Sequence, residues 1–132
     1  MASKYDEITA VLKDLKERHP EICACMVAKK GLEGVVMFPE SFKVDMMASW
    51  EPVERAVDGL LNIISGSSVF HPERAYLEML GYGISFHILS NSDTALILFF
   101  KSSNMDVYNF LSQNNASLSS SRGLIVKIIE AN

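Results

Sequence analysis

The segment from Trp50 to Ile64 constrains the fold most, because its apolar residues spread over an unusually wide part of a helix surface. At 100° per residue they occupy an arc of about 200°, whereas a surface helix needs a stripe only slightly wider than about 100° to pack on its own core. The arc consists of Trp50, Val53, Ala56, Val57, Gly59, Leu60, Leu61, Ile63 and Ile64. We therefore expect this helix to contact a sheet and a second partner, most simply its own copy in another subunit. A central helix in a larger core is the alternative.

Length and charge restrict the class of protein. A chain of 132 residues is expected to form a single domain over 1–132 and to bury a core of its own. The net charge of −4, with few clustered lysines and arginines, argues against binding to nucleic acid or to an anionic membrane surface. The longest apolar run, Ile22 to Ala28, is far shorter than a membrane-spanning helix, so no membrane insertion is expected.

The two cysteines, Cys23 and Cys25, are separated by one residue. On a strand their side chains share a face, but a disulfide between neighbours at this spacing is strained. With no secretory segment at the N-terminus, reduced thiols in the cytoplasm are the expectation. Together with His19 they offer three metal ligands, which is one fewer than a structural zinc site requires, and we predict no metal.

Helical patterns open and close the chain. Ser3 with Asp6 predicts a helix start, and apolar residues then recur at helical spacing until His19-Pro20. Ser103 with Asp106 predicts the start of another helix that continues through Leu111. Ser117 to Ser121 indicates a break, after which Leu124, Ile125, Ile128 and Ile129 recur at helical spacing. The β-branched residues there also suit a strand, so the sequence leaves the structure of the tail from 117 to 132 open.

Five strands are predicted between these helices. Two of them, Ile22–Ala28 and Ala95–Phe100, are apolar on both faces and belong in the middle of a sheet. Val35–Phe38 is short and Ala75–Leu80 contains Glu78, so these two belong at the edges. Ile84–Leu89 alternates apolar and polar residues. The predicted turns contain Gly31 and Gly34, Gly66 after the long helix, Gly81-Tyr82-Gly83, and Ser90 to Asp93.

Motifs that carry chemistry are scarce. Neither GxxxxGK[ST] nor GxGxxG occurs, so the chain is not expected to hydrolyse a nucleotide by itself. Pairing Cys25 with His71 or His87 would give a nucleophile and a base, but no local signature supports such a pair. His87 points away from the face that holds Phe86, and a hydrogen-bonded histidine under a helix is the favoured interpretation.

The order of elements resembles the roadblock family of dynein light chains and small-GTPase regulators. The likeness is carried by the helix Ser3–Arg18, the hairpin Ile22–Phe38, the helix Trp50–Ile64 and the strands around Tyr76, Phe86 and Phe99. It implies an α+β fold in which a five-stranded antiparallel sheet has the long helix on one face and the terminal helices on the other. It also implies pairing through the long helix and the strand after it, action as a scaffold, and no catalytic residue or cofactor to transfer.

Our hypothesis is a non-catalytic dimer of this chain, or of this chain with a roadblock paralogue, that regulates or recruits a small GTPase or a motor complex. Close approach of the two long helices would use Ala56, Gly59 and Leu60. The predicted interface is Trp50, Val53, Ala56, Val57, Gly59, Leu60, Ile63, Tyr76, Glu78 and Leu80. The alternative is a small-ligand sensor or enzyme of profilin-like architecture with a Cys/His pocket.

Overall fold

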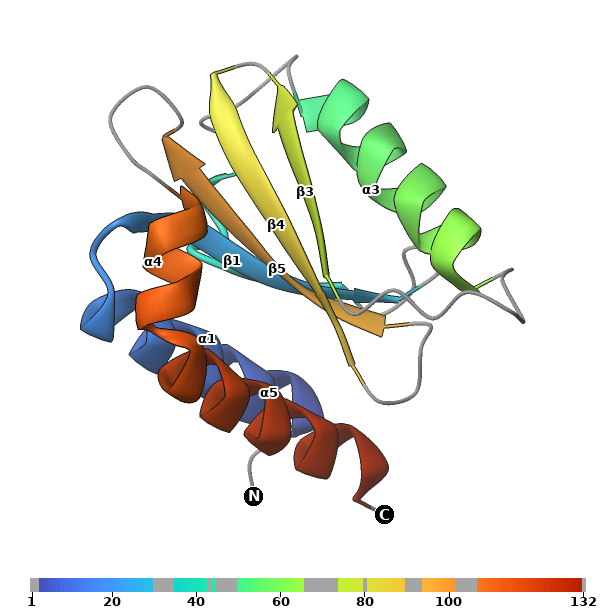
Figure 1. Cartoon of the computed structure of the whole chain (residues 1–132). Helices are drawn as coiled ribbons and strands as arrows, with labels where there is room; N and C mark the ends of the chain where they lie inside the picture. Colours follow the sequence, from blue (N-terminus) through green and yellow to red (C-terminus); the bar gives the residue numbers. More distant parts are fainter. Residues whose placement is uncertain are drawn as a thin grey trace.

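Figure 1 shows the computed structural model of the chain, in which a five-stranded sheet separates α3 from the other helices. The structure describes residues 3–29, 35–42, 44, 50–65, 74–79, 81–89, 94–101 and 107–131. The helices are α1 (Lys4–Arg18), α3 (Trp50–Ser65), α4 (Val107–Gln113) and α5 (Asn115–Glu130). The strands are β1 (Ile22–Lys29), β2 (Val36–Phe38), β3 (Arg74–Met79), β4 (Tyr82–Ile88) and β5 (Thr94–Lys101).

The strands lie in the order β2-β1-β5-β4-β3, and every neighbouring pair is antiparallel. The two strands predicted to be central, now β1 and β5, pair with each other, for example Cys25 with Leu98. The two strands predicted at the edges are β2 and β3. Polarity therefore ordered the sheet correctly, because a strand covered on both faces has no room for charged side chains.

Side chains alternate along each strand and build two separate cores. Towards α3 the sheet contributes Ala24, Met26, Ile84, Phe86, Ile97 and Phe99, packed with Val53, Val57 and Leu61 of the helix. Towards α1, α4 and α5 it contributes Ile22, Cys25, Val27, Leu96, Leu98 and Phe100, packed with Ile8, Leu12, Leu15, Phe110, Leu118 and Ile125. The predicted layering, with the long helix on one face and the terminal helices on the other, is confirmed (Figure 1).

The start of α1 follows the predicted capping box. Ser3 precedes the helix, and its hydroxyl accepts a hydrogen bond of 3.1 Å from the backbone N–H of Asp6. The Asp6 carboxylate accepts one from the backbone N–H of Ser3. These bonds satisfy backbone donors that the first helical turn leaves without an internal partner. The helix ends before His19, whose backbone N–H still donates to the carbonyl of Leu15.

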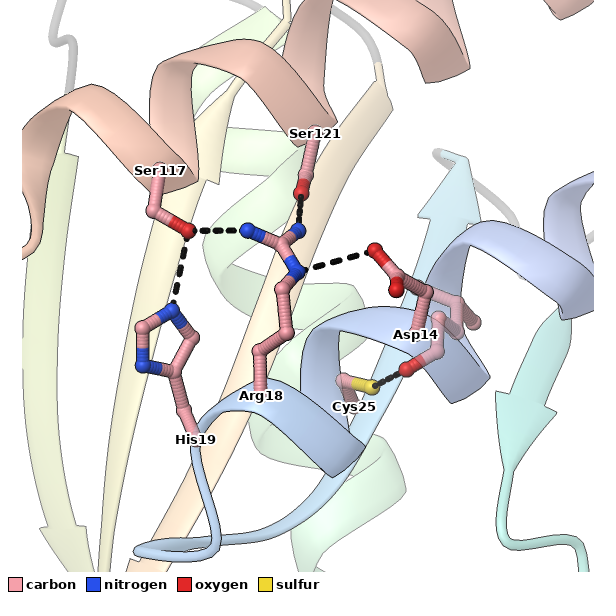
Figure 2. A network of polar contacts seen from close by, with 7 residues as sticks. Asp14, Arg18, His19, Cys25, Ser117 and Ser121 are labelled. Atoms are coloured by element: carbon pink, nitrogen blue, oxygen red, sulfur yellow. Dashed lines mark hydrogen bonds and ion pairs between the residues drawn. The ribbon is translucent and has the colours of Figure 1, made fainter.

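The predicted break at Ser117 to Ser121 is wrong, because both residues lie inside the continuous helix α5. Serines favour breaks when their hydroxyls compete for the adjacent backbone. Here Arg18 at the end of α1 donates to the hydroxyls of Ser117 at 2.6 Å and Ser121 at 3.2 Å, as Figure 2 shows. His19 adds a 2.9 Å contact between its Nε2 and the Ser117 hydroxyl. These contacts dock the tail along α1 as a helix.

The fourth strand begins earlier than predicted. Of the predicted turn, only Gly81 lies outside a strand, and its φ of +80° is the left-handed conformation that glycine adopts without strain. Tyr82 and Gly83 belong to β4, where Tyr82 pairs with Met79 and Gly83 with Glu78. Gly81 thus lies in the connection between β3 and β4.

Several sequence predictions lie outside the described residues. They are the turn glycines Gly31, Gly34 and Gly66, the turn Ser90–Asp93, and the helix start at Ser103 and Asp106.

Candidate interaction surface

The sheet covers only part of the apolar arc of α3. Val53, Val57 and Leu61 follow one another at intervals of four residues and are buried against the sheet. On the same helix Gly59 is exposed and the Ile63 side chain is 70% exposed. Between these two groups, Ala56 and Leu60 are half-buried. We call Ala56, Gly59, Leu60 and Ile63 the outer stripe of α3, since they form the apolar surface that the sheet leaves uncovered.

Val53 and Val57 occupy a different place from the one expected. They are 1% and 0% exposed, so a second copy cannot touch them while the core is intact. Trp50 is half-buried, with its ring 6.2 Å from that of Phe99 and its indole N–H donating to Glu54 at 2.9 Å. Periodicity showed that these three positions are apolar but not which side of the arc meets the sheet. Burial removes Val53 and Val57 from the accessible surface, while Trp50, the outer stripe and β3 stay a prediction.

The strand β3 forms one edge of the sheet, and Figure 1 shows α3 next to this edge. It pairs with β4 alone among the described strands, so one row of its backbone N–H and C=O groups faces outward. Of the interface residues predicted on this strand, Tyr76 is 46% exposed, Glu78 is exposed, and Leu80 lies outside the described residues. The edge and the outer stripe are the two surfaces that the sequence predicted to form a seam.

Tyr76 has a fixed position on this edge. Its hydroxyl donates to the Glu78 carboxylate at 3.1 Å, and burial together with this carboxylate raises the pKa of the phenol. The ring lies over Gly83 of β4, where a β-carbon would approach the ring atoms Cζ and Cε1 to 3.1 and 3.2 Å. The sequence does not reveal this contact, because its pattern predicts a turn at Gly83. The missing side chain of Gly83 gives the Tyr76 ring its place.

A groove of about 500 Å³ runs along the other side of β3, between this strand and α4. Tyr76 and Glu78 line one wall, and Val107, Tyr108 and Leu111 line the other. Among the residues that the structure describes, neither a histidine nor a cysteine lines this groove. Neither Cys25 nor His87 of the alternative hypothesis lines this cavity. The sequence does not reveal the groove, because the strand and the helix are distant in the chain.

Cys25 is buried on β1 under α1. Its thiol lies 3.4 Å from the carbonyl oxygen of Leu12, and burial raises the pKa to about 12, a shift that the charge of Lys16 only partly opposes. A thiol with such a pKa remains protonated at neutral pH and is a poor nucleophile. The strand β5 separates Cys25 from His87, and His71 lies outside the described residues.

His87 lies on the face predicted for it, under the terminal helices. It is 3% exposed, and its Nε2 lies 3.0 Å from the hydroxyl of Ser85, which is also buried. Burial lowers the pKa to about 3, and the charges of Arg122 and Arg74 act in the same direction. The imidazole is therefore neutral at physiological pH, as expected of a structural histidine. The predicted hydrogen-bonded core position is confirmed.

Within the described ranges, no group of three or more histidine, cysteine, aspartate or glutamate side chains is arranged to hold a metal ion. Over the same residues, no helix has both the length and the apolar character needed to cross a bilayer.

Comparison with solved structures identifies the architecture. No protein-family model matches the sequence, and no curated protein matches it either. MglB of Myxococcus xanthus superposes with a TM-score of 0.60 at 16% identity, covering 98% of this chain and 92% of the other. A Roadblock/LC7 domain from Streptomyces avermitillis gives a TM-score of 0.53 at 14% identity, covering 92% and 97%. The chain has the roadblock fold.

The comparison confirms the resemblance and fold class inferred from element order. At these identities the likeness concerns the path of the backbone, and the roadblock fold by itself assigns no partner. The functional argument therefore depends on what this chain places on its surface. Its described surface combines the outer stripe of α3 with a free strand edge.

Proposed function

We propose that the chain is a non-catalytic interaction module that dimerises through α3 and β3 and acts in the cytoplasm on a Ras-like small GTPase. The outer stripe of α3 is the observation that carries the proposal. It contains two small residues, Ala56 and Gly59, next to the larger Leu60 and Ile63. Small residues allow two helices to approach closely while larger apolar neighbours exclude water.

The free edge of β3 supports the same pairing. An exposed edge with unpaired backbone groups associates readily with another strand, so natural proteins cover it or use it. Pairing of two β3 strands would extend the sheet across the dimer and bring the two copies of α3 together on one face. A paralogue with the same apolar stripe would fit equally well, and mixing experiments with such a chain distinguish the two cases.

The dimer is tested by the solution mass of the purified chain. A monomer has a mass of 14.7 kDa, and the proposal requires twice this value at micromolar concentration. Gly59→Arg should return the mass to that of a monomer, because a charged side chain then occupies the outer stripe. Asn62→Arg is the matched control, since Asn62 is exposed on the polar side of the same helix. If the wild-type chain sediments as a monomer at micromolar concentrations, the dimer is refuted.

Regulation of a small GTPase is supported by the resemblance of the chain to the roadblock family, many of whose members act as scaffolds for such proteins. The test is retention of purified small GTPases from the same genome on immobilised chain, in the GDP state and the GTP-analogue state. We expect one of them to be retained in a nucleotide-dependent way and its hydrolysis or exchange rate to change. If none is retained although the chain dimerises, the role is assembly of another complex, such as a motor.

A further inference from the structure

The edge strand β3 has two chemically different sides. Arg74, Tyr76 and Glu78 pair with His87, Ser85 and Gly83 of β4 and share the side that faces α4. Ala75 and Leu77 are half-buried against the core beneath α3. The side towards α4 thus carries a cation, a phenol and an anion at intervals of two residues. This pattern restricts how two copies of the strand can align.

Two copies of one strand related by a two-fold axis run antiparallel, and residues equally distant from the axis face each other. Directly opposed residues point to the same side of a sheet. The axis must then pass through a residue, which faces its own copy. An axis between two residues would place each residue opposite its neighbour in sequence, whose side chain points to the other side of the sheet. For β3 the choice of this central residue defines the whole register.

We infer that the axis passes through Tyr76, an inference that rests on the dimer proposed above. In this register Arg74 faces Glu78 of the partner subunit, and by symmetry Glu78 faces the partner's Arg74. Two ion pairs then flank the centre of the seam. On the other side Ala75 lies opposite the partner's Leu77, so a small residue meets a larger one.

The neighbouring registers are electrostatically worse. With Ala75 or Leu77 at the centre, neither Arg74 nor Glu78 faces a charged residue. With Arg74 at the centre, Arg74 faces its own copy, and with Glu78 at the centre, Glu78 does. Like charges directly opposite each other are destabilising. The register centred on Tyr76 is therefore the one that satisfies both charges.

The position of the Tyr76 ring favours the same register. The ring lies over Gly83, on the strand inside the sheet, and so leans away from the free edge. Its hydroxyl also holds the Glu78 carboxylate at 3.1 Å. A tyrosine at the centre of the seam thus leaves room for its copy and positions the anion that meets the partner's Arg74.

Disulfide trapping identifies which residue of β3 lies opposite its own copy at the two-fold axis. Opposed residues have β-carbons about 4.5–5.5 Å apart, and diagonal neighbours about 7–8 Å, which is too far for a disulfide. Under mild oxidation Tyr76→Cys should form a covalent dimer, whereas Ala75→Cys and Leu77→Cys should not. The wild-type chain measures any background from Cys23 and Cys25. Cross-linking at position 75 or 77 instead of 76 overturns the inferred register.

Charge exchange tests the ion pairs without cysteine. Arg74→Glu places glutamates opposite each other at both pairs, and Glu78→Arg places arginines there. Each variant should self-associate about tenfold or more weakly than the wild type. Mixed together, the two variants restore opposite charges at both pairs and should form a heterodimer of nearly wild-type affinity, as should the double variant with itself. Lys101→Glu, on the adjacent end of β5, serves as a control for net charge.

The outcomes separate this register from the proposed function. If the wild-type chain is monomeric, the dimer itself is refuted. If it is dimeric but the two charge variants fail to complement each other, the dimer stands and the register is refuted. Complementation together with a cross-link at position 76 supports both.

Discussion

Arg18 and Ser117 lie 99 residues apart in the sequence, and the guanidinium of one donates a 2.6 Å hydrogen bond to the hydroxyl of the other. The same guanidinium reaches Ser121 and the Asp14 carboxylate, so one side chain joins the end of α1 to α5 (Figure 2). Ser121 is completely buried, and Arg18 donates the hydrogen bond to its hydroxyl. This arginine therefore adds polar contacts to the apolar packing of Leu118 and Ile125 that holds the tail against the core.

Replacing Arg18 with methionine should lower the free energy of unfolding by about 1–2 kcal/mol. The variant keeps an apolar side chain but removes the hydrogen bonds that Arg18 donates to Ser117 and Ser121. Urea denaturation measures the change. Asp14→Asn is the control, because the ion pair between Asp14 and Arg18 is largely exposed and should contribute less than about 0.5 kcal/mol. Equal losses in the two variants would show that the hydrogen bonds from Arg18 to Ser117 and Ser121 do not stabilise the protein.

Gly83→Ala should destabilise the edge of the sheet by about 1 kcal/mol, since the new methyl group displaces the Tyr76 ring from its position. Adding Tyr76→Ser should recover part of this loss, because the ring is then absent. Gly123→Ala is the matched control: nothing lies within 4 Å of a β-carbon at this helical position, so stability should rise by up to about 1 kcal/mol. Thermal denaturation compares the variants. A purely additive effect of the changes at 83 and 76 would refute the contact.

Stability should fall on acidification because of His87. The folded pKa of about 3 is below the ordinary 6.5, so between these values the unfolded chain binds a proton that the folded chain does not. The stabilisation is complete above pH 6.5 and is lost as pH falls towards 3, with a slope of at most about 1.4 kcal/mol per pH unit. His87→Gln should flatten this part of the profile in urea denaturation at several pH values. His19→Gln, at the half-exposed histidine beside Ser117, should retain it.

Cys25 should resist thiol reagents in the folded protein, because the thiol is buried and its pKa is near 12. With Ellman's reagent at pH 8, a Cys23→Ala variant should react only as fast as the protein opens, whereas Cys25→Ala leaves the more accessible Cys23 to react faster. The raised pKa also predicts loss of stability above pH 9. The unfolded thiol ionises there, and the folded thiol does not until about pH 12. Rapid labelling of the Cys23→Ala variant at native stability would contradict this assignment.

Local sequence patterns predicted much of the fold. The charge-free segments of β1 and β5 placed them in the middle of the sheet, and Glu78 placed β3 at the edge. These predictions succeeded because the polarity of a residue reports whether its environment contains water, whichever elements provide that environment. The roadblock architecture followed from the order of such elements.

The tertiary structure decided which partner each apolar residue meets. Val53 and Ile63 both belong to the arc of α3, yet one is buried against the sheet and the other is exposed, and no property of either residue distinguishes them. Ser117 lies in a helix that packs on the core, where Arg18 donates to its hydroxyl, and Gly83 lies in a strand under Tyr76. Hydropathy measures a tendency to leave water, which has no direction. The direction comes from contacts between segments far apart in the chain, and these exist only after folding.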